Sequence, residues 1–286
     1  MHGLADLIDG LERLGTGVIL VMGKGGVGKT TIAAAIAVAL ADRGHSVHLT
    51  TTDPAAHVHH AVSERVGGLR VSRIDPAKVT QEYSAAVLAK AAPSLDAQGV
   101  ALLEEDLRSP CTEEIAVFRA FADIVSGGRS AFVVIDTAPT GHTLLLLDSA
   151  EAYHREVSRT NSDMPEAVRR LLPRLRDAAY THVVLVTLPE ATPVHEAARL
   201  QADLQRAGIT PEAWVINQSL SANGFSDPLL AERAAREAPF IAEVNHALAK
   251  RIAVVPWTPT EPVGVEGLRT LVLGVNELVS SEVSAI

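Results

Sequence analysis

Residues 23–30, GKGGVGKT, combine glycine, lysine and threonine at a spacing that suits phosphate binding. They follow the apolar run Val18–Met22 and precede the alanine-rich run Thr31–Ala37. The pattern G-x-x-x-x-G-K-T between a strand and a helix is typical of a loop whose backbone N–H groups hold nucleotide phosphates. We therefore expect Lys29 to reach the β- and γ-phosphates and the Thr30 hydroxyl to contact Mg²⁺.

A second lysine, Lys24, directly follows the first glycine of this loop. This arrangement resembles a subclass of phosphate loops in which the extra lysine reaches the nucleotide of a facing subunit. It indicates a nucleotide site shared between two copies or two similar halves.

Three polar residues lie at the ends of predicted strands, where ligands of open α/β sheets bind. Asp53 would position or deprotonate an attacking water, although an Asp-Pro pair is also typical of a plain turn. Asp136 ends the apolar run Phe132–Ile135 and would be a second Mg²⁺ anchor, with a helix cap as the alternative. The Asn217 amide would pair with an adenine edge, although asparagine at a strand end is more often a turn residue.

Short Val/Ile-rich runs alternate with helical patterns along the chain, which predicts an α/β fold with a mostly parallel sheet flanked by helices. The predicted strands are Val18–Met22, Ser46–Thr51, Arg70–Ile74, Ala131–Asp136, His182–Thr187, Ala213–Asn217 and Arg251–Val255. The predicted helices are Thr30–Arg43, Thr112–Val125, Pro165–Ala179, Pro193–Ala207, Asp227–Ala249 and Val263–Val279. The segment Val79–Asp106 interrupts the alternation, so we expect a small helical insertion at about 79–125 within a single domain, residues 1–286.

Composition restricts the partners. The chain has a net charge of −9 and a pI of about 5.6, which argues against a nucleic-acid partner. No apolar run reaches the roughly 18 residues of a membrane span, so direct membrane insertion is not expected. A single cysteine and the lack of a signal-peptide pattern predict a cytoplasmic protein.

Three motifs together resemble the ArsA family of ATPases. They are GKGGVGKTT at 23–31, TTDPAAHV at 51–58 and VVIDTAPTGHTLLLLD at 133–148. The resemblance continues through RIDP at 73–76, EEDLRSPCTEEIAVF at 104–118, AYHREV at 152–157, VLVTLPE at 184–190 and WVINQSL at 214–220, and so covers nearly the whole chain. This family includes the arsenical-pump ATPase and the eukaryotic ATPase that targets tail-anchored proteins.

The region around Cys111 is more similar to the C-terminal half of the duplicated arsenical-pump ATPase than to its N-terminal half. Because such enzymes carry two halves and this chain carries one, the resemblance implies a homodimer or a pairing with a second ArsA-like half.

The resemblance also implies residue roles. Catalysis would involve Asp53, Lys24 and Lys29, with Thr30 and Asp136 on Mg²⁺. The adenine would be held by Asn217 and the loop 256–263, which begins at Pro256. Phosphate binding would fall to Gly25, Gly26, Val27, Gly28, Lys29, Thr30 and Thr31.

A metalloid site is implied at Ser109, Cys111 and His142. As(III) and Sb(III) prefer soft thiolate ligands, and Ser109-Pro110-Cys111 reads as a helix cap followed by a first turn. Against this, a lone cysteine is more often a small buried hydrophobe and a lone histidine a structural residue. One thiol cannot satisfy a three-coordinate metalloid, so a second copy or half would have to complete the site.

The function that these observations favour is hydrolysis of ATP to ADP and phosphate, with Mg²⁺, to energise or regulate arsenite/antimonite extrusion through a membrane pump subunit. As(III) or Sb(III) would act as allosteric effectors, and the protein would lie at the inner face of the membrane only through the pump. Two alternatives stay open: a client-targeting ATPase of the tail-anchored-protein type and a positioning ATPase of the ParA/MinD type.

Overall fold

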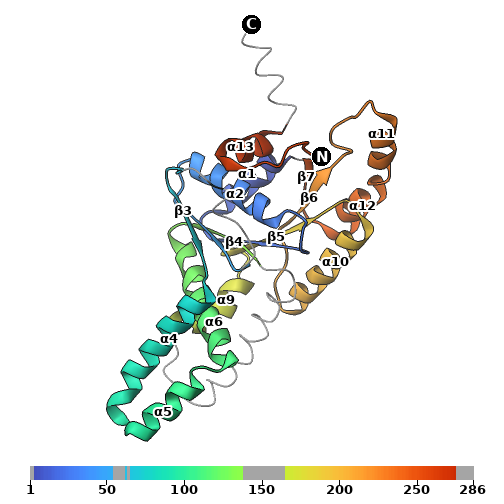
Figure 1. Ribbon diagram of the computed structural model, residues 1–286. Coiled ribbons are helices and arrows are strands. Elements are labelled where there is room, and N and C mark those ends of the chain that lie inside the picture. The colour runs from blue at the N-terminus through green and yellow to red at the C-terminus, as the bar shows by residue number, and fades with distance from the viewer. Residues whose placement is uncertain (1–2, 54–61, 63–64, 138–164, 275–286) are drawn as a thin grey trace.

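The computed structural model describes residues 3–53, 62, 65–137 and 165–274 (Figure 1). Within this part of the chain the strands form one seven-stranded sheet in the order β3-β2-β4-β1-β5-β6-β7, with every neighbouring pair parallel. The strands are β1 (Val18–Met22), β2 (Val47–Thr51), β3 (Leu69–Arg73), β4 (Phe132–Asp136), β5 (Thr181–Thr187), β6 (Ala213–Ser219) and β7 (Ile252–Pro256). The prediction of a mostly parallel sheet is confirmed, and all seven predicted strands are present with ends shifted by no more than a few residues.

Strand β1 lies at the centre of the sheet, between β4 and β5. The chain first builds β2 and β3 on one side of β1, inserts β4, and then crosses to build β5, β6 and β7 on the other side. In open parallel sheets a ligand crevice forms at the carboxyl end of the strand where the connections change direction. The loop after β1 therefore occupies the position where a ligand site is expected.

Helices cover both faces of the sheet (Figure 1). One face packs against α1 (Leu4–Leu14), α2 (Lys29–Asp42) and α13 (Gly264–Leu273). The other face packs against α6 (Pro110–Ser126), α8 (Glu166–Arg169), α9 (Leu171–Arg176), α10 (Ala191–Arg206) and α12 (Ala238–Glu243). Alternate residues of β1 enter the two cores, so a strand buried on both faces is apolar throughout.

Helix α2 is almost entirely buried between the sheet and the outer helices α1 and α13. Its small alanines allow close packing, and Ile32, Ile36 and Leu40 have no exposed surface. Each such side chain stabilises the fold by about 1.5–3 kcal/mol through burial. Because α2 begins directly after the glycine-rich loop, this packing also holds the loop against the end of β1.

Helices α4 (Pro76–Ala91) and α5 (Ala97–Asp106) extend away from the sheet (Figure 1). A short 3₁₀ turn, Ala92–Ser94, joins them, and neither helix contains a buried residue. Asp75 and Asp96 cap them by accepting hydrogen bonds from backbone N–H groups of their first turns. These helices and α6 occupy the stretch predicted as a helical insertion, and the assignment of one domain stays a prediction.

Three predicted helices are wrong in extent. The helix predicted at Val263–Val279 ends at Leu273, before Gly274 with its φ of 74°. Residues 275–279 lie outside the described part of the chain.

The other two helices each contain an internal proline. Pro173 cannot donate to the carbonyl four residues earlier, and α8 ends at that residue, Arg169. Likewise, Pro239 cannot donate to the carbonyl of Ala235, and α11 (Pro228–Ala235) ends at that residue. A π-helical turn, Val244–Leu248, follows α12.

The helix α1 was not predicted from the sequence. Its residues Leu4, Leu7, Ile8 and Leu11 form a buried stripe at helical spacing. Among the described residues no helix is both long enough and apolar enough to span a bilayer.

His182, the second residue of β5, is buried at the amino-terminal edge of the sheet. Neither ring nitrogen has a hydrogen-bond partner among the described residues. Burial lowers the pKa of His182 from its usual 6.5, although the carboxylates of Glu212 and Asp177 oppose the shift. Protonation of this buried ring therefore destabilises the folded protein.

We predict that His182 makes the protein less stable in mild acid. Because the pKa of His182 is lower in the folded chain, the unfolded chain binds more protons in mild acid. The free energy of unfolding therefore has its full value with respect to His182 above about pH 6.5 and decreases as the pH falls below that value. Urea unfolding of His182→Leu between pH 5 and 8 should show a flatter dependence of unfolding free energy on pH. Thr181→Val, which changes a buried polar side chain of the same strand without removing a titratable group, is the control and should keep the wild-type slope. Equal slopes in wild type and His182→Leu would contradict the assignment.

Candidate functional site

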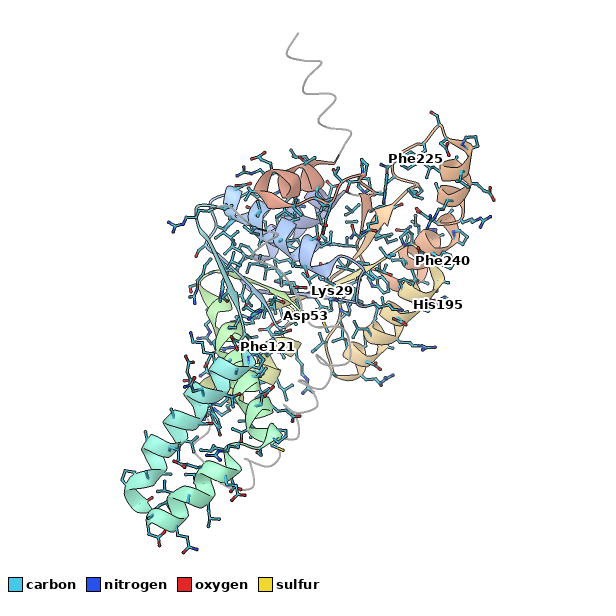
Figure 2. All side chains as sticks on the ribbon, in the orientation of Figure 1. Lys29, Asp53, Phe121, His195, Phe225 and Phe240 are labelled. Carbon is cyan, nitrogen blue, oxygen red and sulfur yellow. The ribbon has the colours of Figure 1, made fainter. Side chains whose placement is uncertain are left out.

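A cavity of about 490 Å³ opens at the carboxyl ends of the strands, beside the glycine-rich loop. Its size is that of a small-molecule site. It is lined by Gly25, Gly26, Gly28, Lys29, Thr30, Thr31, Asp53, Asn217, Gln218, Pro256, Trp257, Thr258, Glu261, Pro262 and Leu271. Figure 2 shows Lys29 and Asp53 near each other, and the charge of the Asp53 carboxylate acts on the Lys29 ammonium group. The fold thus brings most of the predicted nucleotide residues to one cavity.

The loop after β1 needs glycine for two separate reasons. Gly26 and Gly28 have φ angles of 80° and 89°, in the left-handed region that other residues rarely adopt. Gly28 also leaves no room for a side chain, because a Cβ atom there would lie 2.2 Å from the Asn217 Nδ2 atom. Gly28, the N-cap residue of α2, has no side chain that could cap the helix, so the first N–H groups of α2 suit an anion.

Lys29 is buried at the start of α2, and its Nζ donates to the Lys24 carbonyl oxygen at 2.9 Å. Burial lowers the pKa of Lys29, while the carboxylates of Asp136 and Asp53 raise it. A poorly hydrated ammonium group of this kind gains strongly from a phosphate oxygen beside it. The Nζ atom would exchange the Lys24 carbonyl for that oxygen.

Lys24 forms an ion pair with Glu196 of α10, with 3.1 Å between Nζ and Oε1. Both side chains are about 40% exposed, at 40% and 39%. Ion pairs at such exposure contribute roughly 0–1 kcal/mol, so little energy holds Lys24 in this position. The ion pair is therefore too weak to prevent the Lys24 ammonium group from moving to another acceptor.

Asp136, the last residue of β4, is fully buried next to the loop. Its Oδ2 accepts hydrogen bonds from the hydroxyls of Thr30, at 2.8 Å, and Thr51, at 3.2 Å. Its Oδ1 has no partner in the described part of the chain. Burial raises the pKa of Asp136, whereas the Thr30 hydrogen bond and the Lys29 charge lower it.

The Thr30–Asp136 pair suits Mg²⁺. This ion takes oxygen ligands, keeps several waters and shares its site with substrate phosphates. The unpartnered Oδ1 of Asp136 and the Thr30 hydroxyl supply such oxygens. Within the described ranges no group of three His, Cys, Asp or Glu residues is arranged to hold a metal ion.

Asn217, near the end of β6, lines the cavity directly against the glycine-rich loop, and its side chain is buried. Its Nδ2 donates to the Val27 carbonyl oxygen at 3.0 Å, so the amide holds the glycine-rich loop. This contact was not predicted. The predicted pairing of Asn217 with an adenine edge stays a prediction.

Two lining residues, Gln218 and Leu271, were missed in the sequence. Gln218 has a left-handed backbone, with φ of 55°, at an irregularity in the pairing of β6 and β7, and nothing in the local sequence indicates it. Trp257 belongs to the predicted adenine loop 256–263 and packs edge-on against Phe225 with ring centres 6.3 Å apart. Aromatic rings of this kind are common walls of nucleotide-sized cavities.

The predicted metalloid residues are only partly described. Ser109 is the N-cap residue before α6, as predicted, but its hydroxyl contacts the Thr112 hydroxyl rather than a backbone N–H. Cys111 lies in the first turn and is exposed, which argues against the alternative of a small buried hydrophobe. His142 lies outside the described residues.

The geometry of the cavity agrees with sequence comparison. A sequence model of the anion-transporting ATPases matches residues 16–172 and 150–276, which together contain the loop, Asp53, Asp136 and Asn217. This chain belongs to the anion-transporting ATPase family.

Relatives within or near this ATPase family differ in how closely they match. The chain is 53% identical over 270 residues to an arsenical pump-driving ATPase of Escherichia coli, covering 94% of this chain and 46% of the relative. The arsenical pump-driving ATPase of Acidiphilium multivorum is 53% identical over 268 residues, with the same coverage of 94% and 46%. ATPase GET3C of Arabidopsis thaliana is 27% identical over 259 residues, covering 70% of this chain and 66% of the relative. The chain thus spans about half the length of the two pump-driving relatives.

We predict that Gly28→Ala destabilises the protein more than Gly26→Ala. Both variants place alanine at a positive φ, but a Cβ at Gly26 meets nothing within 4 Å, whereas one at Gly28 displaces Asn217. The additional loss for Gly28→Ala should be about 1–3 kcal/mol in urea unfolding without nucleotide.

The double variant Gly28→Ala/Asn217→Ala tests the cause. Its loss should be smaller than the sum of the two single losses, because Asn217→Ala removes the atom that clashes. Equal losses for the two glycine variants, or strict additivity in the double variant, would contradict the assigned contact.

Proposed function

We propose that this chain is an ATPase that hydrolyses ATP to ADP and phosphate and so energises or regulates arsenite/antimonite extrusion through a membrane pump subunit. The observation that carries the proposal is the phosphate loop beside the buried Thr30–Asp136 pair, in a chain 53% identical to arsenical pump-driving ATPases. The protein would act from the cytoplasmic side and approach the membrane only through the pump.

Each residue of the site would have a separate role in ATP hydrolysis. Backbone N–H groups of the loop and the start of α2 would hold the phosphates, and Lys29 would bind the transferred phosphoryl group. Asp53 lines the same cavity and would orient the attacking water and accept its proton. Thr30 and Asp136 would hold Mg²⁺, which when bound offsets the charge that builds up on the phosphates.

The adenine end of the nucleotide would lie between Asn217 and the loop that begins at Pro256. Both border the cavity, and Trp257 adds an aromatic wall. An adenine ring is flat and largely apolar, so it suits a wall of this composition.

The complete ATPase would be an assembly in which this chain pairs with another copy of itself or with a separate ArsA-like half. Support comes from the weak Lys24–Glu196 pair, which leaves Lys24 available to a facing nucleotide, and from the coverage of about half of the pump-driving relatives. The sequence around Cys111 favours equivalence to the C-terminal half. Residues 1–286 would form one domain of this assembly.

The metalloid would act as an effector. Exposed Cys111 offers a soft sulfur ligand at the start of α6, and Ser109 and His142 would add ligands with those of the second half. Because His142 follows Asp136 in the chain, occupation of this site would influence the nucleotide site.

The client-targeting and positioning alternatives have less support. The pump-driving ATPases match at 53% identity, whereas the other named relative, ATPase GET3C, matches at 27%.

We predict that antimonite stimulates ATP hydrolysis by the purified protein severalfold and that Cys111→Ser removes the stimulation but keeps the basal rate. The reason is that the thiol is the soft ligand of the effector site and lies outside the nucleotide cavity. Phosphate release measured with and without antimonite, at saturating MgATP, gives the answer.

Ser94→Ala, which removes an exposed hydroxyl on the same helical extension, is the control and should keep the stimulation. If wild-type protein hydrolyses ATP rapidly and antimonite does not change the rate, antimonite is not an effector of this chain by itself.

We predict that Lys24→Ala and Asp53→Ala each lower turnover by at least about tenfold, since each removes a charge from the reacting phosphates or water. Lys24→Ala should still bind nucleotide. Glu196→Gln is the matched control, because it also breaks the ion pair but keeps the lysine.

A mixture of the two inactive variants tests whether Lys24 acts across an interface. If two copies pair, a mixed dimer holds one site with both groups intact, and the mixture regains part of the wild-type rate. Full turnover by Lys24→Ala protein would show that the lysine has no such role.

A further inference from the structure

One hydroxyl connects the two acidic residues of the site. Thr51, the last residue of β2, is buried, and its Oγ1 donates to the Oδ2 of Asp136 at 3.2 Å. The same Oγ1 accepts a hydrogen bond from the backbone N–H of Asp53 at 3.0 Å. A hydroxyl has one hydrogen to donate, so its single donor is committed to Asp136.

The backbone reinforces this connection. Thr51 is paired with Asp136 in the register of β2 and β4, and the N–H of Thr52 donates to the Asp136 carbonyl at 3.0 Å. The start of the Asp53 loop is therefore attached to the end of β4 at two points. Only one of them, the Thr51 hydroxyl, reaches the Asp136 carboxylate.

The same hydroxyl restricts how the carboxylate can turn. Thr30 and Thr51 both donate to Oδ2, so Oδ1 is left as the oxygen without a partner among the described residues. Loss of one donor would let a buried carboxylate rotate toward other orientations, because hydrogen bonds to a charged group are among the stronger constraints on its position.

We propose that Thr51 is a positioning residue that makes Asp53 and Asp136 move as one unit. Through its hydroxyl, a shift of the Asp136 carboxylate is transmitted to the backbone of Asp53, and the water-orienting carboxylate follows the metal-side carboxylate. The inference rests on the ATPase function proposed above. It adds that the metal side and the water side of the site are coupled through one side chain.

The strand supplies a matched control. Thr50 is also fully buried in β2, and its hydroxyl accepts a hydrogen bond from the Ser72 hydroxyl at 3.0 Å. Adjacent strand residues point to opposite faces, so Thr50→Val removes a buried hydroxyl of the same kind away from the carboxylates. Valine replaces threonine with nearly the same shape, whereas serine keeps the hydroxyl and loses only the methyl group.

The first experiment compares Thr51→Val, Thr51→Ser and Thr50→Val in steady-state hydrolysis. Thr51→Val should lower kcat by about tenfold or more, the effect of one hydrogen bond to a charged group, and leave KM for ATP at saturating Mg²⁺ within about twofold. It should also raise the Mg²⁺ concentration needed for half-maximal rate. Thr51→Ser should restore most of kcat, and Thr50→Val should behave as wild type.

The second experiment does not depend on turnover. Trp257 lines the cavity, so its fluorescence reports ATP binding, and the other tryptophan, Trp214, is buried away from the cavity lining. With EDTA present, Thr51→Val and wild type should bind ATP with equal affinity. With limiting Mg²⁺, the gain in affinity that the ion gives should be severalfold smaller in Thr51→Val.

Each outcome decides the matter. A wild-type kcat and Mg²⁺ dependence in Thr51→Val would overturn the positioning role, as would a Thr51→Ser variant as impaired as Thr51→Val. Equal impairment in Thr50→Val would show that any buried hydroxyl of β2 has this effect and would also overturn it. Failure of wild-type protein to bind ATP would instead overturn the proposed ATPase function.

Discussion

The buried carboxylate of Asp136 is the point on which the rest of the site depends. It lies where β4 ends between β1 and β2, and it is removed from water at an energetic cost that raises its pKa. The hydroxyls of Thr30 and Thr51 and the charge of Lys29 offset this cost. These groups come from the start of α2 and the end of β2. A single buried charge thus holds three separate elements in one arrangement.

The parallel sheet makes this arrangement possible. Because β1 has β4 on one side and β5 on the other, the loop after β1 opens into the crevice between the two directions of chain connection. Helix α2, buried on nearly all sides, then presents the uncapped N–H groups of its first turn to that crevice. Asn217, from β6, donates a hydrogen bond to the Val27 carbonyl of the glycine-rich loop. Its amide occupies space that a side chain at position 28 would need. Distant strands therefore contribute directly to the shape of a short loop.

Lys24 and Asp136 are constrained very differently. Among the described residues Lys24 is held by a half-exposed ion pair with Glu196. The carboxylate of Asp136, in contrast, is buried and held by two hydroxyls and the charge of Lys29. Strong constraint on the metal side and weak constraint on Lys24 suits a site in which this lysine moves when an anion enters.

Much of this was determined by local sequence. Residues 23–30 indicate a phosphate loop because the backbone angles and N–H groups depend on nearby glycines. The strands are recognisable because burial on both faces requires continuous Val and Ile. Some local signals were overlooked: Pro173 and Pro239 interrupt two of the predicted helices because proline lacks an N–H, and the apolar stripe of α1 has ordinary helical spacing. Only the tertiary structure decided that Asn217 holds the loop, that Thr51 joins Asp53 to Asp136, and that Lys24 rests on Glu196. In the Asn217 and Lys24 pairs the partners lie far apart in the chain, and the Thr51 link depends on strand pairing, so no local pattern records any of them.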